Sequence, residues 1–164
     1  MRVRNTIRTG ALIALAAMAV GCDTAAESDE SVRDENDAIV ESGEVGVFSM
    51  QLGDCLENMG VGDGIESAVG VPCSSPHESE VYYSFNLEGD EFPGEDEVGI
   101  ASDEGCFDAF EPFVGAPYET SIFDIITLNP TKDSWELGDD REVLCLLIRV
   151  DGEMMEGSAE GAAQ

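Results

Sequence analysis

The sequence predicts an α+β fold, in which one main helix packs on a small antiparallel sheet, a short second helix follows, and two disulfides join the elements. Three observations predict it. Several short β-type runs surround one long segment of helical spacing. Apolar residues make up 43% of the 164 residues, which is enough for a core. Four cysteines remain once Cys22, which directly follows an export-type leader, is set aside.

The β-type runs before the helix are short and bounded by turn residues. Residues 80–86 (EVYYSFN) alternate most clearly between two faces, as a half-buried strand does. Residues 47–52 also alternate and predict a strand that ends at Gly53. Residues 68–73 predict another strand, which stops at the turn after Cys73.

The main helix is predicted over residues 95–113. Pro93 and Gly94 precede three acids, which suit the positive end of the helix macrodipole. Gly99 and Gly105 weaken a continuous helix. Apolar residues recur at helical spacing, and one of them is a cysteine whose sulfur is expected to point toward the sheet: Val98, Ala101, Cys106, Ala109, Phe110 and Phe113.

The last elements are a strand, a short helix and a central strand. Residues 121–128 form a β-type run, and Thr131 is expected to cap a helical turn over 132–137 that ends at Gly138. Residues 142–150 are apolar on both faces, which predicts a strand buried inside the sheet.

The N-terminus has the layout of an export signal. Residues 1–9 carry three arginines, residues 10–20 are small and apolar, and Gly21-Cys22 leads into a polar run. The apolar stretch is about half of the ~20 residues that span a bilayer, so a permanent transmembrane helix is the weaker interpretation. Ala19-Val20-Gly21-Cys22 resembles a bacterial lipobox, although Ala19 stands where Leu is usual.

The lipobox resemblance implies that residues 1–21 are a lipoprotein signal peptide and that Cys22 is acylated and becomes the N-terminus. A diacylglyceryl cysteine satisfies the requirement of two acyl chains for stable anchoring. We therefore expect a lipid-anchored protein on the extracytoplasmic face of the cell membrane. The alternative is an ordinary signal peptide that is cleaved nearby.

Export to an oxidising compartment predicts that the other cysteines form disulfides. Four cysteines allow three pairings, and we favour those that join neighbouring segments, Cys55 with Cys73 and Cys106 with Cys145.

The alternative to disulfides is a metal site. The sequence has no C-x-x-C, and its single histidine lies four residues from Cys73, so zinc-type spacing is absent. Turn aspartates also lack the EF-hand pattern: Asp54, Asp63, Asp139 and Asp140. We expect no metal and no cofactor.

The chain is strongly acidic, with a formal net charge of −29. Such a surface repels nucleic acid, which excludes a DNA- or RNA-binding function.

Nine acids fall in residues 23–46, so residues 22–46 are predicted to be a lipidated cysteine and a disordered acidic tether. Residues 151–164 are predicted to be a flexible acidic tail, which leaves 47–150 as the folded domain. Adaptation to high salt is a second explanation of the acidity.

The order of turn residues and cysteines resembles the actinobacterial septum formation domain over about residues 47–150. The matching residues are Gly53-Asp54-Cys55, Val71-Pro72-Cys73, Pro76-His77, Glu80-Val81, Pro93-Gly94, Cys106, Pro130-Thr131, Trp135, Gly138-Asp139, Arg141 and Cys145. The resemblance implies an actinobacterial envelope protein that is held by a transmembrane helix or by lipid. It implies no reaction, cofactor or catalytic residue. This chain departs from members that have a spanning helix and a proline-rich segment.

A catalytic constellation is not evident in the sequence. His77 is the only histidine, there is no G-x-S-x-G motif, and the expected role of His77 is a turn residue bonded to Glu80 or to a backbone group. Trp135 is a candidate contact for a partner, with a core or lid position as the alternative.

We expect a non-catalytic interaction module of the cell envelope that contacts envelope or division proteins. The alternative is a domain that binds or hydrolyses cell-wall material through the His77 turn and nearby carboxylates.

Overall fold

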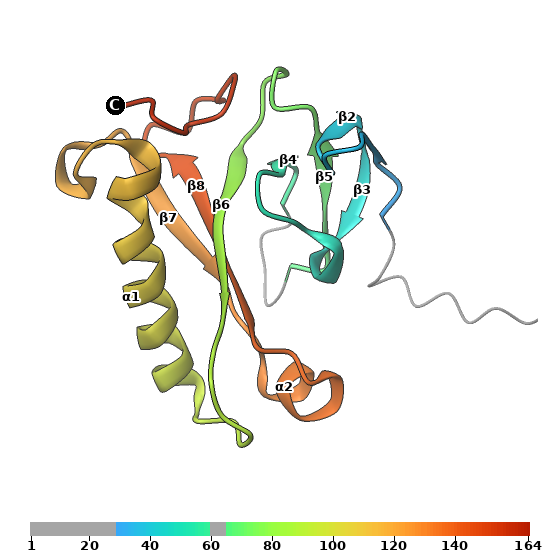
Figure 1. Cartoon of the computed structure of the whole chain (residues 1–164), viewed down its shortest axis with the longest axis vertical. Coiled ribbons are helices and arrows are strands. Elements are labelled where there is room, and N and C mark those ends of the chain that lie inside the picture. The colour runs from blue at the N-terminus through green and yellow to red at the C-terminus, as the bar shows by residue number, and fades with distance from the viewer. Residues whose placement is uncertain (1–28, 60–64) are drawn as a thin grey trace, which may run out of the picture.

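The computed structural model describes residues 29–59 and 65–164, and confirms the α+β fold (Figure 1). Six antiparallel strands form one sheet in the order β3-β5-β4-β6-β8-β7, and β1 and β2 form a separate pair. The strands are β1 (Val32–Arg33), β2 (Ile39–Glu41), β3 (Gly43–Gly46), β4 (Cys55–Glu57), β5 (Ser67–Val71), β6 (Ser79–Asn86), β7 (Phe123–Leu128) and β8 (Glu142–Arg149). The helices are α1 (Glu95–Val114) and α2 (Lys132–Gly138), with 3₁₀ turns η2 (Val47–Ser49) and η3 (Tyr118–Thr120).

β8 is the central strand that its two apolar faces predicted. On one face, Cys145 and Leu147 belong to the core that α1 covers. On the other face, Leu144 and Leu146 belong to a second core, together with residues of β3, β4 and β5. In Figure 1, α1 lies along one side of β6, β7 and β8, while β3, β4 and β5 lie on the other side. β8 therefore separates the two apolar cores.

α1 confirms the predicted helix, including the inward direction of Cys106, which is completely buried. The helix ends at Gly115, which adopts the left-handed conformation (φ 80°) that favours glycine. Gly105 packs directly on the ring of Phe85 in β6, and a Cβ at this position would overlap that ring. A glycine that weakens the helix locally is thus what permits its close approach to the sheet.

α2 confirms the predicted cap. The Thr131 hydroxyl accepts a hydrogen bond from the Ser134 N–H at 3.1 Å, and the Ser134 hydroxyl accepts one from the Thr131 N–H at 2.9 Å. These reciprocal bonds satisfy backbone donors that a helix start leaves without partners. The helix ends at Gly138, as predicted, and Asp139 takes the left-handed position after it.

Two predictions about strands were wrong. Residues 47–52 do not form a strand, because η2 occupies Val47–Ser49 and the strand of this region is β3, which lies just before it. In β6 the pairing with β8 shifts register between Val81 and Tyr83, so the alternation is interrupted there. Val81 lies in the second core, whereas Tyr82 and Phe85, three residues apart, both face the first core, so the two faces of the strand are exchanged between them. A β-bulge explains the reversal, since one extra residue exchanges the two faces of a strand.

The prediction of a disordered tether is wrong for residues 29–46. This segment forms β1, β2 and β3, and it buries the side chains of Ile39 and Val45 in the second core. Composition indicated disorder because residues 23–46 hold nine acids and few apolar residues. Ile39 and Val45 share this core with Ala68 of β5 and with Leu144 and Leu146 of β8, which lie far along the chain. Cys22 and the rest of the predicted tether lie outside the described residues.

The prediction of a flexible acidic tail is also wrong. Residues 151–164 cross the start of β6 and the end of α1, and they bury Met155 and Ala159 in the first core (Figure 1). The backbone of Gly161 donates a hydrogen bond to Phe113, and that of Ala163 donates one to Val114, each at 2.8 Å. The folded unit therefore includes residues 29–46 and 151–164, which were predicted to lie outside it.

The described residues contain no helix that is both long enough and apolar enough to cross a lipid bilayer.

Candidate functional site

The four cysteines form the two favoured disulfides. Cys55 of β4 bonds to Cys73, with a Cα–Cα distance of 5.2 Å, and Cys106 of α1 bonds to Cys145 of β8, with a Cα–Cα distance of 5.5 Å. The second bond ties the main helix to the central strand. Loops of these lengths correspond to about 3 and about 4 kcal/mol of stabilisation in the chain-entropy account. The cysteines thus have a structural role.

His77 is buried and does not form a surface site. Its Nδ1 lies 2.8 Å from the carbonyl oxygen of Ser75, so the expected bond to a backbone group is present and the alternative bond to Glu80 is not. The backbone of His77 exchanges hydrogen bonds with Met155 at 3.0 and 2.8 Å. Nε2 is buried and has no hydrogen-bond partner in the described part of the chain. The C-terminal segment therefore covers the turn that a hydrolytic mechanism would use.

Glu80 is the other residue predicted for that turn, and its side chain is only 2% exposed. Its carboxylate accepts hydrogen bonds from the Ser158 hydroxyl and from the Ala159 N–H. Glu80 thus holds the C-terminal segment in place. Since the ring of His77 contacts a carbonyl rather than a hydroxyl or thiol, the structure does not bring a nucleophile and a base together at this turn.

Trp135 is not a surface anchor, because its side chain is only 2% exposed. The guanidinium of Arg141 lies 3.8 Å from the centre of the Trp135 ring, and the Phe92 ring meets it edge-on at 5.7 Å. The indole N–H donates to the carbonyl of Asp90 at 3.3 Å. These contacts form a small cluster that joins α2 to the loop before α1. The prediction of a partner contact was wrong, and the alternative of a core position is what the structure shows.

The turn aspartates have structural partners. Asp54 pairs with Arg33, and Asp140 accepts a hydrogen bond from the Ser134 hydroxyl at 2.8 Å and another from the Glu142 N–H at 3.0 Å. Asp63 lies outside the described residues. Within residues 29–59 and 65–164, no group of three or more His, Cys, Asp or Glu side chains is arranged to hold a metal ion.

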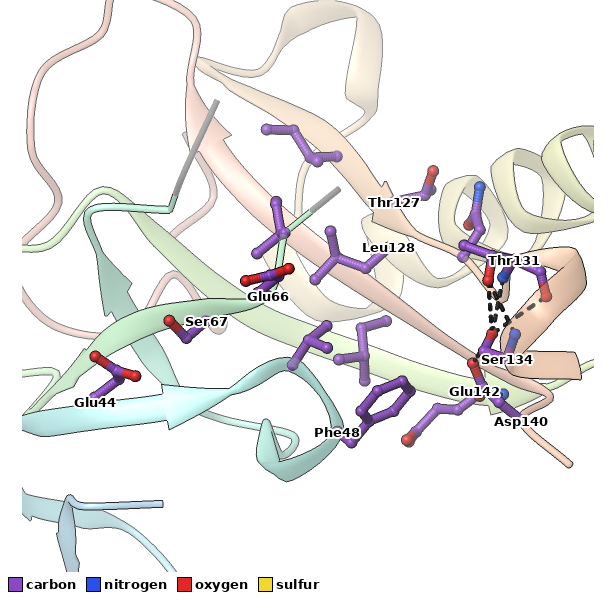
Figure 2. Close-up of a pocket in the computed structure, with 15 residues that line it drawn as sticks. Glu44, Phe48, Glu66, Ser67, Thr127, Leu128, Thr131, Ser134, Asp140 and Glu142 are labelled. Atoms are coloured by element: carbon purple, nitrogen blue, oxygen red, sulfur yellow. Dashed lines mark hydrogen bonds between the residues drawn. The ribbon is translucent and has the colours of Figure 1, made fainter. Parts of the chain in front are cut away.

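A groove that the sequence did not predict lies between the two halves of the sheet (Figure 2). It has a volume of about 800 Å³. One wall comes from β3, η2 and the start of β5, and the other comes from β7, β8 and the start of α2. Its apolar surface is contributed by Val47, Phe48, Ile65, Ile126, Leu128 and Leu144. The Phe48 side chain is 57% exposed, which is unusual for an aromatic ring and leaves apolar area open to a partner.

The rim of the groove is acidic. Glu44 and Glu66 lie on the β3 and β5 side, and Asp140 and Glu142 lie on the α2 and β8 side (Figure 2). None of the described residues that line the groove is basic. An apolar floor inside a ring of carboxylates favours a ligand that carries both apolar and cationic groups. No contiguous motif encodes this site, since its residues come from six separate elements.

The edge strand beside the groove is partly protected against strand addition. The hydrogen-bond ladder with β8 leaves alternate N–H groups of β7 directed outward. Of these, the Phe123 N–H donates to Ser121 Oγ at 3.1 Å, and the Ile125 N–H donates to Asp124 Oδ1 at 2.8 Å. Local side chains thus occupy two edge donors, as natural edge strands often arrange. The two occupied donors belong to the first half of β7, whereas Ile126, Thr127 and Leu128 of its second half line the groove.

The fold and its site define a class: a disulfide-bonded α+β domain with a structured N-terminal segment, a packed C-terminus and one acid-rimmed apolar groove. The family described as "Septum formation" matches residues 21–164, so the chain belongs to the septum formation family. This confirms the resemblance found in residues 47–150, and the match also covers the two segments that were predicted to lie outside the domain. No curated protein and no solved structure matched the chain.

Proposed function

We propose that this protein is a lipid-anchored, extracytoplasmic envelope protein of an actinobacterium that acts in a septum-related process through protein contacts and not by catalysis. Membership of the septum formation family supports the septum-related role. The export-type leader that ends at Cys22 supports the lipid anchor. The two disulfides support an oxidising compartment, because such bonds persist there and are rare in the cytosol.

The observation that carries the protein-contact role is the exposed ring of Phe48 above an apolar floor. Exposed aromatic side chains surrounded by polar residues often contribute most of the binding energy at protein interfaces. We expect Phe48→Ser to keep the fold and to impair division when it replaces the native protein, with longer cells as the readout. Ile100→Ser on α1 removes an equally exposed apolar side chain away from the groove, and it should leave division unchanged. Equal defects in both variants would contradict the role of the groove.

The anchor is tested by the intact mass and location of the protein. The wild type should lack residues 1–21, carry acyl mass on Cys22 and partition with membranes, whereas Cys22→Ser should be released. A wild-type protein without acyl mass would contradict the anchor.

The non-catalytic role has its own test. Purified protein incubated with peptidoglycan should release no soluble fragments above a heat-denatured control. Release of such fragments would overturn this part of the proposal.

A further inference from the structure

The chain enters the domain alongside β3. Asp29 forms an isolated antiparallel β-bridge with Val45, and the Glu30 N–H donates a hydrogen bond to the Glu44 carbonyl at 2.7 Å. Gly43 packs so closely on the backbone of Glu30 that a Cβ would not fit. The first described residues are thus held against an edge of the main sheet.

Arg33 fixes this segment to the rest of the domain. Its guanidinium donates two hydrogen bonds to Asp54, at 2.6 and 2.9 Å, and a third to Asp29 at 2.7 Å. The side chains of Arg33 and Asp54 are 12% and 2% exposed. The hydrogen bonds to Asp54 are the main cause of a raised pKa for Arg33. Segment 29–46 therefore belongs to the domain and adds nothing to the length of a tether.

The connection from Cys22 to the domain is consequently short. Six residues, 23–28, separate Cys22 from Asp29. Even when fully extended, seven residue steps cover at most about 25 Å. A tether that ran to residue 46 would have reached more than three times as far. An acyl group on Cys22 thus keeps the point where the chain enters the domain within about 25 Å of the bilayer surface.

The groove lies at this same point. Glu44, which pairs with Glu30, is also one of the acids on the groove rim, and η2 with Phe48 follows β3 directly. α1 lies on the opposite side of the sheet (Figure 1). A lipid anchor therefore holds the groove close to the membrane.

We propose that the groove binds the membrane-proximal, extracytoplasmic segment of an integral membrane protein, in which apolar residues are flanked by lysine or arginine. This inference rests on the lipid anchor of the proposed function. The short connection excludes partners deep in the cell wall and gives a membrane-embedded partner a high effective concentration. The apolar floor and the acidic rim determine the chemistry of the segment.

The test is photo-crosslinking in living cells that express the full-length protein. A photoreactive phenylalanine analogue replaces Phe48 in one variant and Ile100 in the control, since these side chains are 57% and 61% exposed. Phe48 should give an adduct that stays in membranes after alkaline carbonate washing, with the crosslink mapped next to a membrane-spanning segment of the partner. Ile100 should not give this adduct. An adduct with a soluble or wall-bound protein, or no adduct at all, would overturn the proposal.

Two further variants test its physical basis. A thirty-residue Gly/Ser insertion between Glu27 and Ser28 should keep the anchor and lower the Phe48 adduct yield by about tenfold, because effective concentration falls with linker length. Glu44→Lys with Glu142→Lys should also lower the yield, whereas Glu104→Lys on α1 should not. A Phe48 adduct yield that is unchanged by the insertion or by the charge reversal would contradict the inference. The acyl mass on Cys22, measured in the same cells, shows separately whether the anchor itself has failed.

Discussion

The backbone N–H of Ala159 donates a hydrogen bond to the buried carboxylate of Glu80 at 2.7 Å, across 79 residues of sequence. The Ser158 hydroxyl donates to the other carboxylate oxygen at 2.6 Å. The described part of the chain offers Glu80 no cation within ion-pair distance. A carboxylate without a counterion thus fastens the C-terminal segment over the start of β6.

Removal of this carboxylate should loosen the C-terminal segment. We expect Glu80→Ala to lower the free energy of unfolding by about 3 kcal/mol, because two hydrogen bonds to a charged group are lost and a buried N–H is left without a partner. Glu80→Gln should cost less, since its amide keeps one acceptor. Chemical denaturation measures both changes. Glu78→Gln, at an exposed neighbouring position, is the control, and a loss as large as that of Glu80→Ala would contradict this role.

The ion pair of Arg33 and Asp54 should determine whether segment 29–46 stays attached. Arg33→Ala leaves Asp54 buried without its cation, and we expect a loss of about 3 kcal/mol in unfolding free energy. Limited proteolysis should then cut between residues 29 and 46 before the rest of the domain. Lys132→Ala removes a cation from an exposed pair, with Nζ and Oε1 3.9 Å apart, and should change stability by less than about 1 kcal/mol. An intact segment in Arg33→Ala would show that strand pairing suffices.

Two glycines of α1 should respond to alanine in opposite directions. A Cβ at Gly99 meets open space, so Gly99→Ala should stabilise the protein by about 0.8 kcal/mol through helix propensity. A Cβ at Gly105 would overlap the Phe85 ring, so Gly105→Ala should destabilise it by about 2 kcal/mol. Thermal unfolding of the matched pair measures the difference. A stabilising Gly105→Ala would mean that the helix and β6 can separate without cost.

Asp151 should contribute to stability at neutral pH but not in strong acid. Hydrogen bonds from the Arg149 side chain, and then from the Glu153 N–H, lower the pKa of Asp151 to about 2. A carboxyl group whose pKa is lowered by folding stabilises the protein above its unfolded pKa of about 3.9 and loses this effect as the pH falls through its folded pKa. Asp151→Asn should therefore be less stable than wild type at pH 7, and the difference should disappear between about pH 4 and about pH 2.

Denaturation curves at a series of pH values test this window. Glu119→Gln, at an exposed site without an ion pair among the described residues, should show no such convergence with the wild type. A constant difference between Asp151→Asn and wild type down to pH 2 would contradict the hydrogen-bonded pair of Arg149 and Asp151.

Local patterns predicted the elements whose signals are contained in a short window of sequence. The apolar spacing of α1, the Thr131 cap of α2 and the two apolar faces of β8 each depend on neighbouring residues. The disulfide pairing followed because each bond joins segments that the predicted layout placed together. Composition gave the wrong prediction for residues 29–46 and 151–164, where a few apolar residues pack against other segments of the chain.

The groove could not be predicted, because no local pattern describes it. Phe48 is exposed and Leu144 is buried although both are apolar residues in β-type sequence, and the difference depends on which strands lie beside them. Trp135 was ambiguous for the same reason. Only the packing of Arg141 and Phe92 around its ring placed it in a core.

By itself, the sequence predicted the α+β class, the main helix and the family, and it favoured one of three possible cysteine pairings without excluding the other two. Periodicity, turn residues and cysteine order are properties of the linear sequence, so they can be recognised without a structure. The tertiary structure alone decided that residues 29–46 and 151–164 are folded, that His77 and Glu80 are covered, and that a groove opens beside β3. These features depend on burial between segments far apart in sequence, and burial is a property of the assembled chain.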